Sequence, residues 1–151
     1  MNPQPEDLDF QVRRYVYDST LARGVPPLLA EVSENLQVSV AEVRDAFHRL
    51  GAGRVLVLQP DSGEILMASP FSAVPTPFVV ELGDFSCFGN CIWDALGIAA
   101  MTGRDARVLT ACGDCGTAME VTLANGALRH AEGLAHFAIP ARHWWDDIVF
   151  N

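Results

Sequence analysis

The sequence contains no lysine, and its ten basic residues are all arginines, set against nineteen aspartates and glutamates. The net charge of −9 is spread along the chain: residues 1–80 hold six arginines and ten acids, and residues 81–151 hold four arginines and nine acids. Neither half has a basic stripe of the kind that neutralises phosphate groups. The composition therefore argues against a protein that binds nucleic acid through its charge.

Long apolar runs are also absent. No run approaches the roughly 18 residues that a membrane-spanning helix needs. The N-terminal sequence MNPQPEDLDF is acidic and lacks the basic and apolar regions of a secretory signal peptide. We therefore expect a cytoplasmic protein that does not contact a membrane. Half of the 151 residues are hydrophobic, which excludes a disordered chain and suffices for one domain or one domain with a small module.

Cysteine is absent from the first 86 residues, and the four cysteines of the chain follow closely on one another. They are Cys87, Cys91, Cys112 and Cys115. In a secreted protein this clustering would predict two disulfides. In a cytosolic protein it favours thiol chemistry or metal binding.

The first half of the sequence predicts three helices followed by a hairpin. Ser39 and Glu42 form a capping box at the start of the third helix. This order is typical of a winged helix–turn–helix, but the third helix carries as many acids as arginines. We therefore expect an interaction or packing module more than a DNA reader. The helices are expected at residues 7–23, 26–36 and 40–50, and the strands at 54–58 and 64–68.

The second half predicts a sheet crossed by one helix. The helix is expected at residues 91–101 with Asn90 as its N-cap, after a loop at 83–89. The fold class is thus α+β, with a winged-helix-like module (1–68), an extended proline-rich connector (69–77) and a core (78–151) whose sheet is mixed or antiparallel. The strands are expected at 78–82, 106–111, 118–123, 127–129 and 136–139, and an apolar tail at 144–150 is expected to begin as a helix and end as a strand.

Cys91 is the first candidate nucleophile. In the first turn of a helix, the free N–H groups and the helix dipole lower the pKa of a thiol. Asp94 follows three residues later on the same helical face. A thiolate beside a carboxyl group that carries a proton forms a nucleophile and acid pair. We expect a raised pKa for Asp94 if it is buried near an apolar wall formed by Trp93 or Trp144. The alternative interpretation is that Cys91 is a small buried hydrophobe and Asp94 a first-turn charge.

The second candidate is the turn Cys112-Gly113-Asp114-Cys115-Gly116. Its glycines allow both sulfurs to meet one ion, as in a zinc knuckle. One knuckle supplies half of a tetrahedral site, and Cys87 and Cys91 would supply the other half, although their spacing is unusual for that purpose. A redox pair is less favoured, because a β-like run rather than a helix follows the turn. A turn whose cysteines have no special role is the remaining alternative.

The segment around Cys91 resembles a known family. Residues 83–101 contain Cys-x-x-Asn-Cys-x-Trp-Asp-Ala-Leu-Gly and look like the active-site segment of the alkylmercury (organomercurial) lyases. The resemblance covers nearly the whole chain from about Leu8. It includes the N-terminal module, Pro70-Phe71-Ser72, Pro75-Thr76, the cysteine turn and the run from His136 to Asp147.

This resemblance implies protonolysis of carbon–mercury bonds. Cys91 matches the thiolate that takes the mercury, and Asp94 matches the aspartate that helps to deliver a proton to the leaving carbon. Mercury is a soft ion that prefers thiolate ligands, and no organic cofactor is required. The ligand would be an organomercurial or another small thiophilic compound. The product, inorganic mercury, would pass to small-molecule thiols or to a downstream thiol protein.

The sequence departs from the family pattern at its C-terminal end. The family carries a second active-site cysteine in a strand shortly after the segment that resembles residues 144–150, whereas this sequence ends at Asn151. We therefore expect a short member without that C-terminal segment. An external thiol, Cys87 or the pair Cys112 and Cys115 would then supply the second sulfur.

Two other functions remain open. In one, the chain is a non-catalytic relative that holds zinc, copper or mercury through Cys87, Cys91, Cys112 and Cys115. Loss of the C-terminal strand would also expose a sheet edge, which favours pairing with a second copy or another chain. In the other, the winged-helix-like module serves regulation or interaction.

Overall fold

The computed structural model describes residues 5–149. Its first part consists of three helices and a hairpin, as the sequence predicts. Ser39 caps α3 by accepting a hydrogen bond from the Glu42 N–H, and the Glu42 carboxylate returns a bond to the Ser39 N–H. The elements are α1 (Pro5–Arg23), α2 (Leu29–Leu36), α3 (Val40–Ala52), β1 (Leu56–Leu58) and β2 (Ile65–Ala68).

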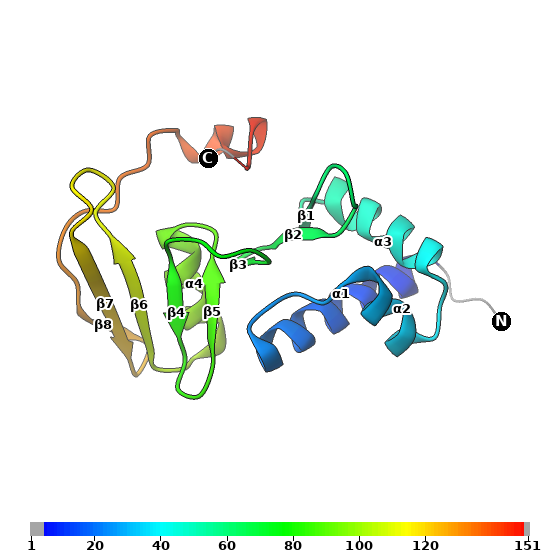
Figure 1. The fold of residues 1–151 in the computed structure, drawn as a ribbon, viewed down its shortest axis with the longest axis horizontal. Helices are drawn as coiled ribbons and strands as arrows, with labels where there is room; N and C mark the ends of the chain where they lie inside the picture. Colours follow the sequence, from blue (N-terminus) through cyan, green and yellow to red (C-terminus); the bar gives the residue numbers. More distant parts are fainter. Residues whose placement is uncertain (1–4, 150–151) are drawn as a thin grey trace.

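The second part completes one antiparallel sheet of eight strands, so the α+β class is confirmed. The strand order is β1-β2-β3-β5-β4-β6-β7-β8, and β1 and β8 are its edges. One helix, α4, packs against β3, β4, β5 and β6 (Figure 1). The elements are β3 (Phe71–Ser72), β4 (Val79–Glu81), β5 (Ser86–Gly89), α4 (Ile92–Thr102), β6 (Ala106–Ala111), β7 (Ala118–Ala124), β8 (Ala127–His130) and a 3₁₀ helix, η1 (Ala141–Asp146).

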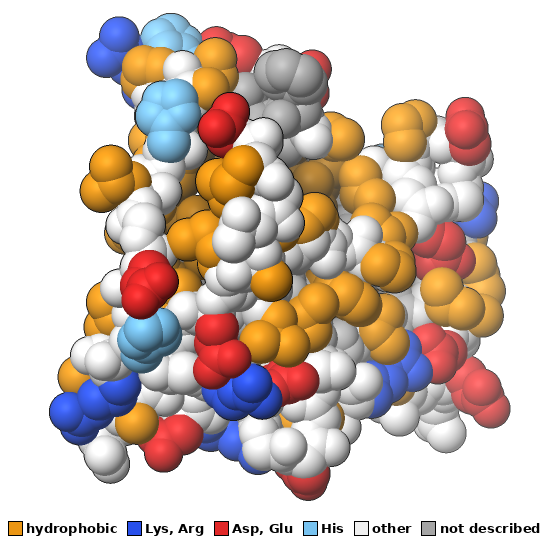
Figure 2. Space-filling view, turned by 60° about the vertical axis from the view of Figure 1, so that its left-hand side comes forward, with side chains coloured by type: hydrophobic (Ala, Val, Ile, Leu, Met, Phe, Trp, Pro, Cys, Tyr) orange, Lys and Arg blue, Asp and Glu red, His pale blue; other side chains and the backbone are white. Residues whose placement is uncertain are grey.

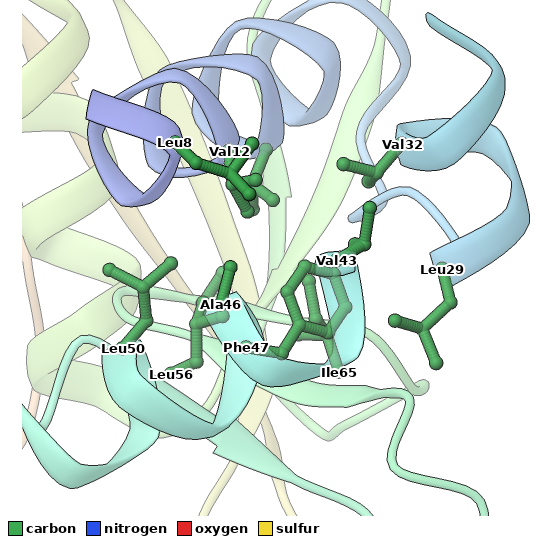
Figure 3. Packing of buried hydrophobic residues seen from close by; sticks show 12 residues of the cluster. Leu8, Val12, Leu29, Val32, Val43, Ala46, Phe47, Leu50, Leu56 and Ile65 are labelled. Atoms are coloured by element: carbon green, nitrogen blue, oxygen red, sulfur yellow. The ribbon is translucent and has the colours of Figure 1, made fainter. Parts of the chain in front are cut away.

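Two hydrophobic clusters stabilise the fold. The first joins the three N-terminal helices to the β1–β2 hairpin, with Val12, Val32 and Phe47 fully buried (Figure 3). The second lies between α4 and the sheet and includes Phe71, Val80, Ile98 and Val108. Tyr17 and Leu21 of α1 pack against this second cluster, so the N-terminal helix contacts both cores.

Four local expectations need correction. Residues 86–89 form β5 rather than a loop, because pairing with β3 and β4 outweighs the weak strand preference of Ser86 and Gly89. The connector 69–77 contributes β3 to the sheet. Residues 136–139 form no strand, and Phe137 instead packs against tryptophan rings. The tail continues from η1 into a turn up to Val149, and Phe150 lies outside the described residues.

The strand register places two chain segments at one end of the sheet. Val79 of β4 pairs with Phe88 of β5 on one side and with Leu109 of β6 on the other. Both neighbours run antiparallel to β4, so β5 and β6 run in the same direction and end together. The start of α4, which follows β5, therefore lies at the same end as the turn that follows β6 (Figure 1). None of the described helices is long and apolar enough to cross a membrane.

Candidate active site

Cys91 lies at the junction of β5 and α4. It is the N-cap of α4, with an extended backbone (φ −148°, ψ −179°), and its Sγ accepts a hydrogen bond from the Asp94 N–H at 3.5 Å. The expected N-cap, Asn90, stands one residue before this position. Gly89 allows the junction because α4 lies directly on it: a Cβ there would come within 2.7 Å of the Ala95 nitrogen.

The pKa of the Cys91 thiol is raised, whereas the sequence predicts a lowered value. Burial is the main cause, because the half-buried thiol loses the water that would solvate its charged form. The hydrogen bonds from the Asp94 and Trp93 N–H groups lower the pKa, as expected at a helix N-terminus, and the Asp94 charge raises it again. The raised pKa therefore favours the protonated form of the free thiol.

Asp94 is held beside this thiol with a raised pKa, as the sequence predicts. Burial is the cause, and a hydrogen bond from Asn90 partly opposes it. The Asn90 amide Nδ2 donates to Asp94 Oδ2 at 2.9 Å and to the Pro70 carbonyl oxygen at 3.2 Å. Asn90 thus fixes the carboxyl group relative to the loop before β3. Its own Oδ1 is buried and has no partner among the described residues.

The two tryptophans that the sequence predicts as an apolar wall beside Asp94 belong to one cluster of aromatic rings. The Trp93 side chain is 61% exposed, and its ring meets Phe137 edge-on at 6.4 Å. Phe137 contacts Trp144 at 5.4 Å, so these rings connect the C-terminal segment to the start of α4. Tyr17 from α1 lies on another side, close enough for the Asp94 charge to raise its pKa further after burial.

Tyr17 also borders a groove next to the site. Its hydroxyl group donates to the Ser69 carbonyl oxygen at 2.9 Å, one residue before Pro70. The groove has a volume of about 450 Å³ and combines apolar, aromatic and arginine side chains. Its lining is Phe10, Arg13, Arg14, Tyr17, Asp18, Leu21, Ser69 and Met101. On the face in Figure 2, basic side chains are scattered among acidic ones.

Cys87 is part of the hydrophobic core. It is 1% exposed, and its Sγ lies 3.9 Å from the Val80 carbonyl oxygen. Burial raises the pKa of this thiol to about 11. The residue therefore serves packing in β5 and is poorly suited to supply a thiolate.

The second thiol region is the turn between β6 and β7. The Cys112 N–H donates to the Thr117 carbonyl oxygen at 2.8 Å, and the Gly116 N–H donates to the Cys112 carbonyl oxygen at 2.9 Å. The exposed Cys115 Sγ lies 3.1 Å from Thr117 Oγ1. The pKa of Cys115 is lowered by hydrogen bonds from Thr117 and then from the Cys112 side chain.

The structure does not assemble the four-cysteine metal site expected from the sequence. All four cysteines are free thiols. Within residues 5–149, no group of three or more histidine, cysteine, aspartate or glutamate side chains could hold a metal ion. The physical reason is that Cys87 is committed to the core and Cys91 caps a helix, while Cys112 and Cys115 belong to a separate turn.

Comparison with known proteins assigns the fold. The sequence model of the alkylmercury lyase family (MerB) matches residues 71–150, which is more than half of the chain. The chain belongs to the alkylmercury lyase family. A solved structure, described as the mercury-bound form of MerB2, superimposes with a TM-score of 0.62 at 20% sequence identity. The alignment covers 84% of this chain and 64% of that one, so this chain spans less than two thirds of its length. No curated protein matches the sequence.

The structure adds functional candidates that sequence reasoning missed. Asn90 was expected to cap a helix but instead holds the Asp94 carboxyl group. Tyr17 has the spacing of a core residue, and nothing in the sequence indicates that α1 reaches the site. Pro70 belongs to the motif that carries the family resemblance, which is the one sequence signal for the loop that Asn90 contacts.

Proposed function

We propose that the chain cleaves carbon–mercury bonds by protonolysis, with Cys91 as the mercury-binding thiolate and Asp94 as the proton donor. The observation that carries this proposal is the first turn of α4, where the Asp94 N–H lies 3.5 Å from Cys91 Sγ and Asn90 holds the carboxyl group. Membership of the alkylmercury lyase family supports the same assignment.

The raised pKa values of Cys91 and Asp94 suggest how a proton passes from the thiol to the leaving carbon. The organomercurial binds Cys91 and displaces the thiol proton, as metal binding to a thiol requires. Asp94 is the adjacent base, and its raised pKa favours taking up that proton. The protonated carboxyl group then donates to the carbon attached to mercury. The carbon–mercury bond breaks, the hydrocarbon leaves, and mercury stays on the Cys91 sulfur as a cation that binds a second thiolate.

An external small-molecule thiol is the proposed source of this second thiolate. Cys87 is unsuited because it is buried and its pKa is about 11. The proposed reaction needs no organic cofactor. Tyr17, which lies close enough for the Asp94 charge to raise its pKa, lines a groove that offers room for the external thiol or for the organic group of the substrate.

Benzene release from phenylmercury, measured with an excess of a small thiol, tests the proposal. We expect turnover by the wild-type chain and its loss in Cys91→Ser. Cys87→Ala is the matched control, because it removes a neighbouring cysteine that the reaction does not use. Turnover that survives Cys91→Ser would refute the lyase assignment. No turnover in wild type together with tight mercury binding would favour the second candidate, a mercury-binding protein on a lyase fold.

We further propose that residues 1–68 form a winged-helix-like module that supports the site, joined through residues 69–77 to the core of residues 78–151. The contacts of Tyr17 and Leu21 with the second core favour this packing role. A gel-shift experiment at low salt should show no binding to DNA. Binding that depends on Arg44 or Arg49 of α3 would instead favour a DNA-reading module.

A further inference from the structure

The turn between β6 and β7 forms a second thiol-lined hollow that the proposed reaction at Cys91 does not use. The hollow has a volume of about 440 Å³. Both cysteines of the turn line it, together with residues that add a hydroxyl, a thioether and an imidazole group. The lining includes Cys112, Cys115, Thr117, Met119 and His130, and the carboxylates of Glu120 and Glu132 also border the hollow.

This hollow and Cys91 lie at the same end of the sheet. Phe88 of β5 and Leu109 of β6 pair with the same residue of β4. Cys91 follows Phe88 by three residues, and Cys112 follows Leu109 by three. Since only β4 separates β5 from β6, the two strands are about 10 Å apart.

Cys112 also lies on the face of the sheet that is covered by α4, the helix that Cys91 caps. Val80, Val108 and Val121 lie across from one another and pack with Ala95 and Ile98 of α4. Side chains at alternate positions of a strand point to the same face, so Thr110 and Cys112 follow Val108 on the face that α4 covers. The ladder continues to Cys112, whose N–H donates to the Thr117 carbonyl oxygen.

Two buried polar atoms without a hydrogen-bond partner among the described residues lie in the segments that lead to the two cysteine sites. In the described part of the chain, the buried side-chain polar atoms without a hydrogen-bond partner are Asn90 Oδ1 and Thr110 Oγ1. Buried polar groups are rarely left unpaired, and such cases point to an absent water, ion or ligand. One of these atoms precedes Cys91 and the other precedes Cys112.

We propose that Cys112 and Cys115 form a two-coordinate thiolate site that receives the inorganic mercury released at Cys91. The proposal rests on the lyase function proposed above. Two sulfurs satisfy a soft cation such as Hg²⁺, so the absence of a metal-binding group of three or more side chains within residues 5–149 is no obstacle. Once one sulfur holds the metal, the other is presented at an effective concentration in the millimolar range, which a free monothiol must exceed to compete.

The transfer is a pair of thiolate exchanges without any oxidation or reduction. Mercury begins between Cys91 Sγ and the sulfur of a small thiol. The Cys112 and Cys115 sulfurs each form a bond to mercury and release their protons. The two original mercury–sulfur bonds break, and those protons end on Cys91 Sγ and on the small thiol. Cys91 is then free for another substrate.

Mercury retention tests the site without relying on carbon–mercury cleavage. The Cys91→Ser chain is loaded with mercuric chloride, dialysed against a small excess of a monothiol and analysed for bound mercury. We expect one mercury per chain. Adding Cys115→Ser or, separately, Cys112→Ser should abolish retention, whereas Asp114→Asn in the Cys91→Ser chain should preserve it. Equal retention without Cys115, or no retention in Cys91→Ser, would overturn the proposed site.

A second arm tests the transfer. Wild-type chain receives less than one equivalent of phenylmercury, and peptide mass spectrometry locates the metal after benzene release. We expect mercury on the peptide with Cys112 and Cys115 in wild type and on Cys91 in Cys115→Ser. Mercury that stays on Cys91 in wild type would overturn the transfer. If the lyase function fails, the phenyl group remains on mercury at Cys91, and the retention experiment still decides the dithiol site.

Discussion

Cys91 and Cys115 lie near the same end of one sheet but in opposite surroundings. Burial raises the pKa of Cys91, whose sulfur accepts a bond from the backbone N–H of a neighbouring acid. Cys115 is exposed in a turn, and hydrogen bonds from Thr117 lower its pKa. The same side chain is therefore protonated and enclosed at one position and more readily ionised and accessible at the other.

This difference matches two tasks that the proposed mercury chemistry requires. A proton must reach carbon while the metal is held, which favours an enclosed thiol next to a carboxyl group. The metal must then leave, which favours an accessible thiolate because exchange proceeds through attack by a thiolate. The environment of each cysteine, more than its identity, distinguishes the two regions.

The largest effect should come from Asp94→Asn, which removes the proposed proton donor and keeps the shape of the side chain. General acid catalysis contributes about 10²- to 10⁴-fold, so benzene release from phenylmercury should fall by that factor. Phenylmercury should still bind Cys91, which mass spectrometry of the intact chain would detect. Asp114→Asn, which changes an acid between the cysteines of the turn, is the matched control. A wild-type release rate in Asp94→Asn would contradict the assigned role.

A substitution at Gly89 should weaken the packing of α4 on β5 without changing the turn between β6 and β7. A Cβ at Gly89 would lie 2.7 Å from the Ala95 nitrogen and 2.9 Å from its Cα, and backbone atoms cannot easily move away. Gly89→Ala should therefore lower the free energy of unfolding by about 1–3 kcal/mol in urea titrations. Gly113→Ala, where no heavy atom lies within 4 Å, should change it by less than about 0.5 kcal/mol. Equal effects would show that α4 does not rest closely on β5.

The helices were the most predictable part of the fold. The capping box of Ser39 and Glu42 is a local signal, and it marks the start of α3 in the structure as in the sequence. β5 was missed because residues 86–89 have little intrinsic strand preference and become a strand only through partners distant in sequence. The opposite error occurs at residues 136–139, where the apolar pattern predicts a strand that does not form. Phe137 is apolar there because it packs against the rings of Trp93 and Trp144.

The proximity of Cys91 and Asp94 could be predicted from the sequence, whereas the pKa shift of Cys91 could not. The spacing of Cys91 and Asp94 places them in one helical turn, and the raised pKa of Asp94 followed from expected burial. The predicted direction of the Cys91 pKa shift is wrong. The effect of the helix N-terminus is local and visible in the sequence, whereas burial depends on tertiary packing. Tyr17 and Pro70 lie near Asp94 and Asn90 only through the tertiary fold, so no local sequence pattern indicates their proximity to the site.

The pH dependence of benzene release tests the enclosed region further. Asp94 can donate a proton only while protonated, so release should fall as pH rises through its pKa, at a pH above the ordinary range of a carboxyl group. The bond from Asn90 lowers this pKa. Asn90→Ala should therefore move the falling limb to higher pH in single-turnover measurements. A limb that moves to lower pH would show that Asn90 does not stabilise the charged carboxylate.

The smallest effect is expected at the exposed thiol. Thr117→Val removes the hydroxyl group that contributes most to lowering the pKa of Cys115 and keeps a β-branched side chain directly before β7. The thiolate fraction of Cys115 near neutral pH should fall, because the pKa rises. Its alkylation by iodoacetamide, followed by peptide mass spectrometry, should slow by less than about tenfold, since one hydrogen bond in water contributes little. Alkylation of Cys91 in the same samples is the internal reference and should not change. A parallel slowing at both cysteines would mean that the substitution disturbs the whole end of the sheet, and the two thiol regions would then not be independent.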